Sequence, residues 1–292
     1  MRKKKVMKSK KRFYKFLSVL NDQIFNGIDF EKILEIRIVA NRLTEIITDD
    51  KNYFVGNSPV SIEEINEIFS ALCEYSVHAY KNEIIEGYIT YEGGIRVGIC
   101  GTAVYSEEKI YTIKDISALN IRIPHQIKGI SKKFYPYIEK GGILIIGPPC
   151  SGKTTLLRDF SSFAGENFKT TIVDERMEIA GVFKGIPSFD VGNSTVLNGF
   201  IKSEGIKIAV RSMSPEIIIC DEFGDEKDLS SAFFAMKSGV KIVASMHAFD
   251  KKDFISKVFV KKLLESEIFQ TFIFINKNHE IFEILDVKDL LL

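Results

Sequence analysis

The segment GPPCSGKTT has the residue types and spacing of a loop that binds the phosphates of a nucleotide. In it, Gly147, Gly152, Lys153 and Thr154 match the pattern G-x-x-x-x-G-K-[ST]. A loop of this length can wrap its backbone N–H groups around phosphate oxygens, and a helix that starts at its end adds partial positive charge. The sequence therefore predicts a phosphate-binding loop formed by Gly147, Pro148, Pro149, Cys150, Ser151, Gly152, Lys153, Thr154 and Thr155.

The side chains of this loop suit a magnesium–nucleotide complex. Lys153 would neutralise the β and γ phosphates, the Thr154 hydroxyl would bind Mg²⁺, and Thr155 would donate to the nearer phosphate. Cys150 stands where many such loops carry glycine. We therefore expect the backbone conformation at position 150 to be one that a residue with a Cβ atom can adopt.

A second segment, EIIICDE, predicts a buried strand that ends in two adjacent carboxylates. Asp221 would hold Mg²⁺ through water, and Glu222 would orient and partly deprotonate the attacking water. The carboxyl ends of parallel strands meet at one edge of a sheet, where ligands of open α/β folds bind. We therefore expect this pair to face the phosphate loop.

Two further strand ends carry polar residues that point to the same edge. TTIVDERMEIAG presents Asp174, Glu175 and Arg176, and KIVASMHAF presents His247. Each is a candidate for sensing the nucleotide or supporting the metal site. The competing interpretation is that these are ordinary surface groups with satisfied hydrogen bonds.

The elements that would position these residues are short, continuous apolar runs with helical stretches between them. The runs are ILIIG, TTIVD, EIIICDE, KIVASMH and TFIFIN. Continuous rather than alternating apolar residues indicate strands buried on both faces of a mostly parallel sheet. We assign this α/β domain to residues 126–292.

Residues 1–125 have a different pattern, which predicts a smaller α+β domain. FLSVLNDQIFNG favours a short helix, and a strand segment turns at Ala40-Asn41. Ser61 and Glu64 form a capping box, and the apolar spacing after it predicts a helix through Tyr80. Gly93-Gly94 interrupts β-type runs and predicts a hairpin.

Composition excludes several classes of protein. With 292 residues, 45% hydrophobic and 27% charged, the chain is not a disordered or low-complexity protein. No apolar run approaches the roughly 18 residues of a membrane-spanning helix, so we expect a cytoplasmic protein. The four cysteines show no CxxC spacing, so neither a disulfide framework nor a zinc site is indicated.

Charge is distributed unevenly along the chain. Residues 1–16 contain nine Lys or Arg and no acid, and since the whole chain has a net charge of +1, the remainder carries −8. The basic segment could contact anionic lipid or nucleic-acid phosphates, or it could be solvated without a partner. The acidic remainder, with no basic stripe interleaved with aromatic residues, disfavours a nucleic-acid partner.

Several long motifs together resemble one known family. They are GPPCSGKTTLLRD, VDERMEIAG, KSEGIKIAVRSMSPEIIICDEFG and GVKIVASMHA, with GYITYEGGIRVGICG and DISALNIRIP in the first domain. In this order they are similar to the stage III sporulation protein AA family, which is related to type II and type IV secretion ATPases. The resemblance extends from Ile33 to Leu285.

The resemblance implies a RecA-like motor that binds ATP and Mg²⁺, hydrolyses ATP and assembles as a hexameric homo-oligomer. It further implies a role in a secretion-like channel between mother cell and forespore, with a membrane-bound sporulation channel protein as partner and a peripheral position at the membrane facing the mother cell. The residues that it implies for the site, read position by position, are Lys153, Thr154, Glu175, Asp221, Glu222, His247 and Arg211.

The chain also departs from the pattern of secretion ATPases. VGNSTVLNG stands where an arginine and an aspartate are expected, and no arginine follows Glu222 closely. The missing positive charge would then come from Arg96, Arg122 or Arg211, including those of a neighbouring subunit, or hydrolysis would be slow. Two alternatives stay open, a nucleotide-gated scaffold with little hydrolysis and a phosphate-loop protein that acts on nucleic acid.

Overall fold

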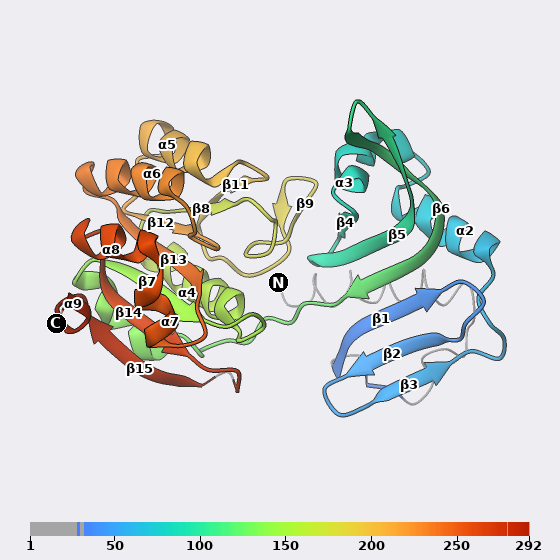
Figure 1. The fold of residues 1–292 in the computed structure, drawn as a ribbon, viewed down its shortest axis with the longest axis horizontal. Coiled ribbons are helices and arrows are strands. Elements are labelled where there is room, and N and C mark those ends of the chain that lie inside the picture. Colours follow the sequence, from blue (N-terminus) through green and yellow to red (C-terminus); the bar gives the residue numbers. More distant parts are fainter. Residues whose placement is uncertain (1–27, 30–31, 279, 292) are drawn as a thin grey trace. The chain divides into compact units, whose positions relative to one another are not determined.

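The computed structural model describes residues 28–29, 32–278 and 280–291, which form two compact units (Figure 1). Unit 1 extends to His125 and also includes Gly181–Ser188. Unit 2 comprises Gln126–Ala180 and Phe189–Leu292. The basic segment 1–16, the expected helix in residues 16–27 and His279 lie outside the described residues.

Unit 1 is built on an antiparallel sheet with the order β3-β2-β1-β6-β5-β4 in the described chain. Its turns are those that the sequence predicts. Asn41 has φ 59° between β1 and β2, and Gly93 and Gly94 have φ 89° and 72° between β4 and β5. The strands are β1 (Ile33–Val39), β2 (Thr44–Thr48), β3 (Asn52–Val55), β4 (Tyr88–Tyr91), β5 (Ile95–Ser106) and β6 (Lys109–Arg122).

The amphipathic helix of unit 1 begins as expected but ends early. Ser61 and Glu64 form both hydrogen bonds of the capping box at the start of α2 (Ile62–Leu72). The expectation of a helix through Tyr80 was wrong, because Glu74 and Tyr75 take positive φ values of 50° and 59° that break the helix. The chain continues as the short helices η2 (Val77–Tyr80) and α3 (Lys81–Ile85).

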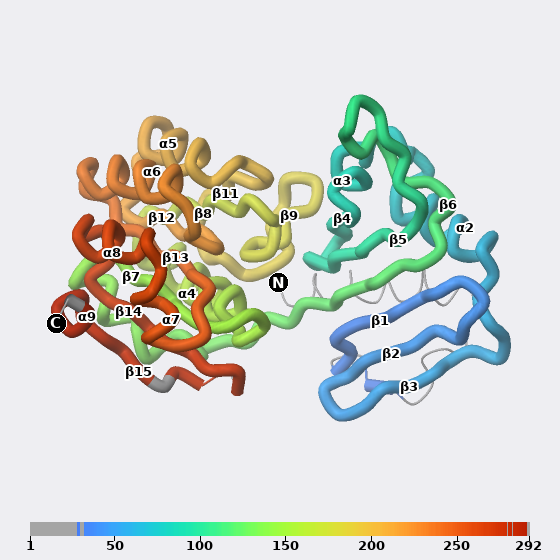
Figure 2. The backbone as a smooth tube through the Cα atoms, viewed as in Figure 1, coloured from blue at the N-terminus to red at the C-terminus, as the bar shows by residue number. Residues whose placement is uncertain are grey.

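Unit 1 also contains a small hairpin formed by β9 (Val182–Phe183) and β10 (Ile186–Pro187). The Phe183 ring packs against Tyr91 at a centroid distance of 5.6 Å, and the Gly93 N–H donates to Ser188 Oγ at 3.1 Å. This hairpin falls within the sequence range that the motifs assign to the second domain. Figure 2 traces the chain as it leaves β8 and passes through the hairpin.

Unit 2 contains a mostly parallel sheet, as the apolar runs predict. Within the described residues its order is β11-β8-β12-β13-β7-β14-β15, and β15 alone pairs antiparallel. The five predicted runs form its central strands, whereas β11 and β15 were not predicted. The strands are β7 (Gly142–Gly147), β8 (Thr170–Asp174), β11 (Thr195–Asn198), β12 (Ile217–Cys220), β13 (Lys241–His247), β14 (Phe269–Ile275) and β15 (Ile281–Asp286).

Helices cover both faces of this sheet. Leu144, Ile146 and Ile218 belong to a buried cluster completed by side chains of α5, α6 and α8. The buried side chains of α4 lie outside that cluster, and successive strand residues face opposite sides, so α4 covers the other face. The helices are η3 (Lys132–Glu139), α4 (Lys153–Asn167), α5 (Lys202–Ser212), α6 (Glu226–Lys237), α7 (Lys251–Ser256), α8 (Val258–Glu265) and α9 (Lys288–Leu291).

In the part of the chain that the structure describes, no helix combines the length and apolar character needed to cross a membrane.

Asp159 on α4 fixes the segment that begins unit 2. Its buried carboxylate accepts hydrogen bonds from the N–H groups of Gly129 and Ser131, both at 2.8 Å, and from Ser131 Oγ at 2.5 Å. Phe134, which follows, stacks on Phe160 of the same helix at 5.6 Å. The helix that starts at the phosphate loop therefore also holds the entry segment of unit 2.

We expect Asp159→Asn to lower the free energy of unfolding by about 1–3 kcal/mol, because an amide cannot accept from all three donors and leaves buried N–H or O–H groups unpaired. Urea denaturation followed by circular dichroism measures the change. The matched control is Glu166→Gln at an exposed position of the same helix. Equal stabilities of the two variants would contradict the anchoring role of Asp159.

Candidate functional site

The predicted phosphate loop lies between β7 and α4. A Cβ atom on Gly147 would be 2.6 Å from Ile275 Cγ1 and 2.7 Å from Ser151 Oγ, so only glycine fits. Gly152 has φ 89° and leads into α4 at Lys153. Cys150 also takes a positive φ, 61°, at a cost of about 1 kcal/mol for a residue with a Cβ. The loop therefore keeps a backbone form that favours glycine even where cysteine stands.

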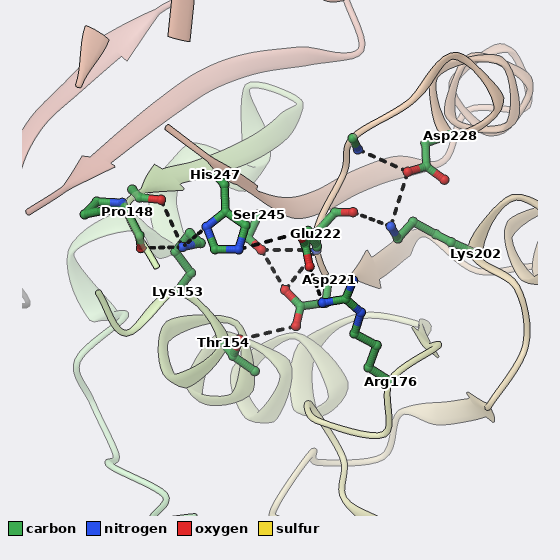
Figure 3. A network of polar contacts seen from close by, with 12 residues as sticks. Pro148, Lys153, Thr154, Arg176, Lys202, Asp221, Glu222, Asp228, Ser245 and His247 are labelled. Carbon is green, nitrogen blue, oxygen red and sulfur yellow. Dashed lines mark hydrogen bonds and ion pairs between the residues drawn. The ribbon is translucent and has the colours of Figure 1, made fainter. Parts of the chain in front are cut away.

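Lys153 is buried, and its ammonium group is fully engaged by the protein. Its Nζ donates to the carbonyl oxygens of Gly147 at 2.9 Å and Pro148 at 2.7 Å, and it lies 3.0 Å from His247 Nδ1 (Figure 3). Burial lowers the pKa of Lys153, whereas the nearby carboxylates of Asp221 and Glu222 raise it. These contacts place a buried cation at the loop, where a phosphate would be bound.

Thr154 and Asp221 face each other across the start of α4. Thr154 Oγ1 donates to Asp221 Oδ2 at 3.2 Å, and Asp221 Oδ1 accepts from Ser245 Oγ at 2.7 Å. The Ser245 hydroxyl thus fixes the carboxylate from the neighbouring strand β13. Hydroxyl and carboxylate oxygens are the ligand types that Mg²⁺ prefers. Thr154 would therefore hold a magnesium ion here directly, and Asp221 would hold it through water.

Glu222 lies beside this pair and is held by two cationic or polar side chains. Its Oε2 is 2.5 Å from Arg176 Nη1, and its Oε1 is 3.5 Å from His247 Nε2. Glu222 has φ 30°, a backbone conformation that residues with a Cβ rarely adopt. The carboxylate that would orient water is therefore paired with Arg176 in this structure.

His247 connects Lys153 to Glu222. Burial lowers the pKa of His247, and the Lys153 ammonium lowers it further. Because an ammonium group can only donate, Nδ1 of a neutral His247 accepts from Lys153 and its proton resides on Nε2, toward Glu222. Figure 3 shows this chain of contacts from Lys153 through His247 to Glu222.

The loop after β8 is held rigidly from two directions. The Asp174 carboxylate accepts from the N–H groups of Glu178, Ile179 and Ala180 at 2.8–3.1 Å. Burial raises the pKa of this carboxyl, and the three donors act in the opposite direction. Arg158 of α4 donates to the carbonyls of Ile179 at 3.1 Å and Glu178 at 2.6 Å, and burial lowers its pKa to about 10. Asp174 thus shapes the loop.

A pocket of about 1120 Å³ lies at this edge of the sheet, within unit 2. It is larger than most small-molecule pockets and has room for a nucleotide. The polar groups of its lining that the sequence predicts are Ser151, Lys153, Thr154, Thr155, Arg176, Asp221, Glu222 and His247. Gly147 and Pro148 contribute the carbonyls that hold Lys153, and Pro149, Cys150 and Gly152 complete the loop lining.

Three candidate residues, Asp174, Glu175 and Arg211, are absent from the described lining of the pocket. Glu175 accepts from the Lys202 N–H at 3.3 Å, and the Arg211 guanidinium lies 6.0 Å from the Phe234 ring centroid. Their roles in chemistry stay predictions. Conversely, the sequence did not single out Glu178, which does line the pocket. Its spacing after Asp174 gave no signal, because the loop that carries it is held by the side chains of Asp174 and Arg158, which bind backbone groups of the loop.

The pocket lining also includes apolar residues that no motif predicts. They are Ile127, Ile130 and Ile281, and the charged residues Lys133 and Glu280 line the pocket as well. Apolar side chains of this kind suit the face of a base, whereas the loop suits phosphates. The Ser151 hydroxyl is buried and has no hydrogen-bond partner among the described residues, which leaves a donor at the loop itself.

A glycine-rich loop between a buried parallel strand and a helix, with an Asp-Glu pair on a neighbouring strand, defines the α/β class of P-loop nucleotide-binding proteins. The chain belongs to the stage III sporulation protein AA family. The family model described as "Sporulation stage III, protein AA" matches residues 7–290. Stage III sporulation protein AA of Bacillus subtilis is 37% identical over 252 residues, which cover 83% of this chain and 82% of the relative.

Solved structures of an ATPase and of a pilus retraction motor have a similar fold. The Legionella pneumophila ATPase DotB is 15% identical with a TM-score of 0.59, and the match covers 88% of this chain and 75% of DotB. The pilus retraction motor PilT, solved with bound ADP, is 16% identical with a TM-score of 0.61, with 88% and 77% of the chains covered. At these identities the likeness describes the fold alone.

The lowered pKa of His247 predicts a pH dependence of stability. Between its folded pKa and the ordinary value of 6.5, the unfolded chain binds more protons, so this group's contribution is present above pH 6.5 and is lost as pH falls below it. We expect the unfolding temperature of the nucleotide-free protein to fall less between about pH 7.5 and about pH 5.5 in His247→Gln than in the native chain. The control is His78→Gln, at an exposed histidine, and its unfolding temperature should fall as much as that of the native chain. Parallel curves for all three proteins would refute the assignment.

Proposed function

We propose that this chain is an ATP-hydrolysing motor of the secretion type that acts in sporulation. The observation that carries the proposal is the convergence of the Lys153 loop, the Thr154–Asp221 pair and Glu222 on one large pocket. The apolar residues Ile127, Ile130 and Ile281 in the lining support a nucleotide rather than a bare phosphate as ligand. Lys153 would bind the β and γ phosphates.

In this proposal Thr154 and Asp221 would hold Mg²⁺, Asp221 through water, and the bound ion would supply positive charge that offsets charge developing on the phosphates. Ser245 holds the Asp221 carboxylate in place. Glu222 orients the attacking water and accepts its proton. His247, whose Nε2 faces Glu222, fixes the direction of that carboxylate.

The positive charge for the terminal phosphate has two possible sources in this proposal. Arg176 lines the pocket of its own chain, but in the structure it pairs with Glu222. Arg211 is absent from the described lining of the pocket, and Arg96 and Arg122 belong to unit 1, so the second source would be one of these arginines in a neighbouring subunit. We favour an arginine from a neighbouring subunit, and with it a homo-oligomeric ring. Arg176 of the same chain would first have to break its ion pair with Glu222.

The same ion pair favours one alternative function, a nucleotide-gated scaffold with little hydrolysis. Arg176 occupies one oxygen of the carboxylate that would activate water. If nucleotide binding leaves this pair intact, Glu222 cannot serve as a base, and the protein would bind ATP without appreciable turnover. The variants below separate the two functions.

We expect Lys153→Ala to weaken ATP binding at least about tenfold, because the loop loses its phosphate cation. Glu222→Gln should keep ATP affinity and lower turnover by about 100-fold or more, because an amide cannot accept a proton. Binding is measured with a fluorescent ATP analogue and turnover by phosphate release. Glu166→Gln, an exposed carboxylate of α4 outside the pocket lining, is the matched control and should behave as the native chain. A native chain that binds ATP without turnover would favour the scaffold.

A shared site also predicts how activity depends on protein concentration. We expect turnover per chain to rise with concentration over the range in which light scattering reports assembly, because each pocket then gains an arginine from its neighbour. Turnover per chain that stays constant through assembly would contradict the shared site. Arg176 of the same chain would then be the remaining pocket arginine.

A further inference from the structure

The structure contains a buried ion pair directly behind the Asp221–Glu222 turn. Lys202, the first residue of α5, and Asp228 of α6 are 7% and 8% exposed, and Lys202 Nζ lies 3.2 Å from Asp228 Oδ2. Neither residue lines the pocket. Figure 3 shows the pair on the far side of the turn from Lys153 and Thr154.

Both members of the pair bind the backbone of the turn. Lys202 Nζ donates to the carbonyl oxygen of Glu222, and Asp228 Oδ2 accepts from the Gly224 N–H at 3.1 Å. The N–H of Glu222 donates to Asp221 Oδ1 and Ser245 Oγ, and the N–H of Phe223 donates to the Ser245 carbonyl at 2.7 Å. The backbone of the turn is therefore held from the pocket side by Asp221 and Ser245 and from behind by the ion pair.

This double attachment matters because Glu222 has a φ of 30°. A residue with a Cβ occupies such a conformation only where its surroundings enforce it. The backbone conformation also sets the direction of the Cα–Cβ bond, and thus where the carboxylate of Glu222 points. If the turn relaxed, the carboxylate would move relative to Thr154 and Asp221.

The position of Lys202 depends on Gly205, which lies one turn further along α5. A Cβ atom on Gly205 would be 2.5 Å from Val173 Cγ1, so α5 approaches β8 as closely as it does only because residue 205 is glycine. The backbone N–H of Lys202 donates to Glu175 Oε2 at 3.3 Å. The start of α5 thus contacts two segments that follow strands. The backbone of Lys202 contacts Glu175, which follows β8, and its side chain contacts Glu222, which follows β12.

We propose that the Lys202–Asp228 pair is a positioning device for hydrolysis, which holds the Glu222 carboxylate in place by fixing the backbone of the 221–224 turn. The proposal rests on the proposed ATPase function. It assigns no contact with ATP to either residue. Because the two charges compensate each other, replacing both leaves the net charge behind the pocket unchanged, and ATP affinity should be preserved.

The decisive variant is the double substitution Lys202→Met with Asp228→Leu. Removing one partner alone would leave an unpaired buried charge and destabilise the protein, whereas replacing a buried ion pair with apolar residues of similar size is often neutral for stability. A purely structural pair therefore predicts a double variant with native stability and native turnover. A positioning pair predicts native stability with impaired turnover, because the hydrogen bonds to the carbonyl of Glu222 and the N–H of Gly224 are lost.

We expect the full-length double variant to unfold within a few degrees of the native chain, to bind the fluorescent ATP analogue within about twofold, and to lose about ten- to a hundredfold in kcat with little change in KM. The control is Lys262→Met. It removes an exposed lysine of α8 that pairs with Glu226, and Glu226 lies on α6, the helix that carries Asp228. Turnover of the double variant within twofold of native would overturn the proposal.

A second measurement does not depend on hydrolysis. In nucleotide-free protein, amide hydrogen exchange of the peptide that contains Phe223 and Gly224 should be faster in the double variant than in the native chain, and unchanged in Lys262→Met. Unchanged exchange in the double variant would overturn the positioning role. If the native chain shows no turnover at any concentration, the proposed ATPase function fails, and the exchange data alone decide whether the pair fixes the turn.

Discussion

Parallel pairing of four strands places the groups of the candidate site next to one another. In the registers, His247 at the end of β13 pairs with Gly147 at the end of β7, and Cys220 pairs with both Ala244 of β13 and Val173 of β8. The residues that follow these ends therefore emerge at one edge of the sheet, although they are distant in sequence. Every contact among Lys153, Asp221 and His247 depends on this register, because a slip by one residue would turn each side chain to the opposite face.

The same register explains why much of the site could be predicted from the sequence. Strand ends are marked by a change from apolar to polar residues, and Asp221, Glu222 and His247 all stand at such a change. Once the runs are recognised as parallel strands, their polar ends must meet. The fold class and most strands of unit 2 followed from the same reasoning. What these residues do chemically stays a prediction.

Other features could not be predicted because they depend on tertiary contacts. Lys202 resembles any lysine at a helix start, and its burial follows from the close approach of α5 to β8 that Gly205 permits. The early end of α2 has no glycine or proline signal, since Glu74 and Tyr75 themselves adopt positive φ. The hairpin 181–188 is short, and its membership in unit 1 arises from packing on Tyr91 and Gly93.

The charged groups of the site have partners within the protein. Lys153 uses two carbonyls and His247, and Glu222 uses Arg176. A phosphate ligand must replace neutral acceptors of Lys153 with charged oxygens, and such charge-assisted hydrogen bonds are stronger than the ones they replace. Removing Arg176 from Glu222 requires an anion that competes with a carboxylate, which a terminal phosphate provides.

Arg176 lies on the loop that Asp174 and Arg158 hold, and this loop has a particular place in the chain. It begins at the end of β8 and continues at Gly181 into the hairpin of unit 1. The chain returns to unit 2 at Phe189, and the next residue, Asp190, exchanges two hydrogen bonds with Gln126, the first residue of unit 2. The segment that carries Arg176 is therefore covalently continuous with unit 1 and rigidly attached at its unit 2 end. Because Asp174 holds the N–H groups of Glu178, Ile179 and Ala180, a movement of the Arg176 side chain would leave the backbone that enters unit 1 in place.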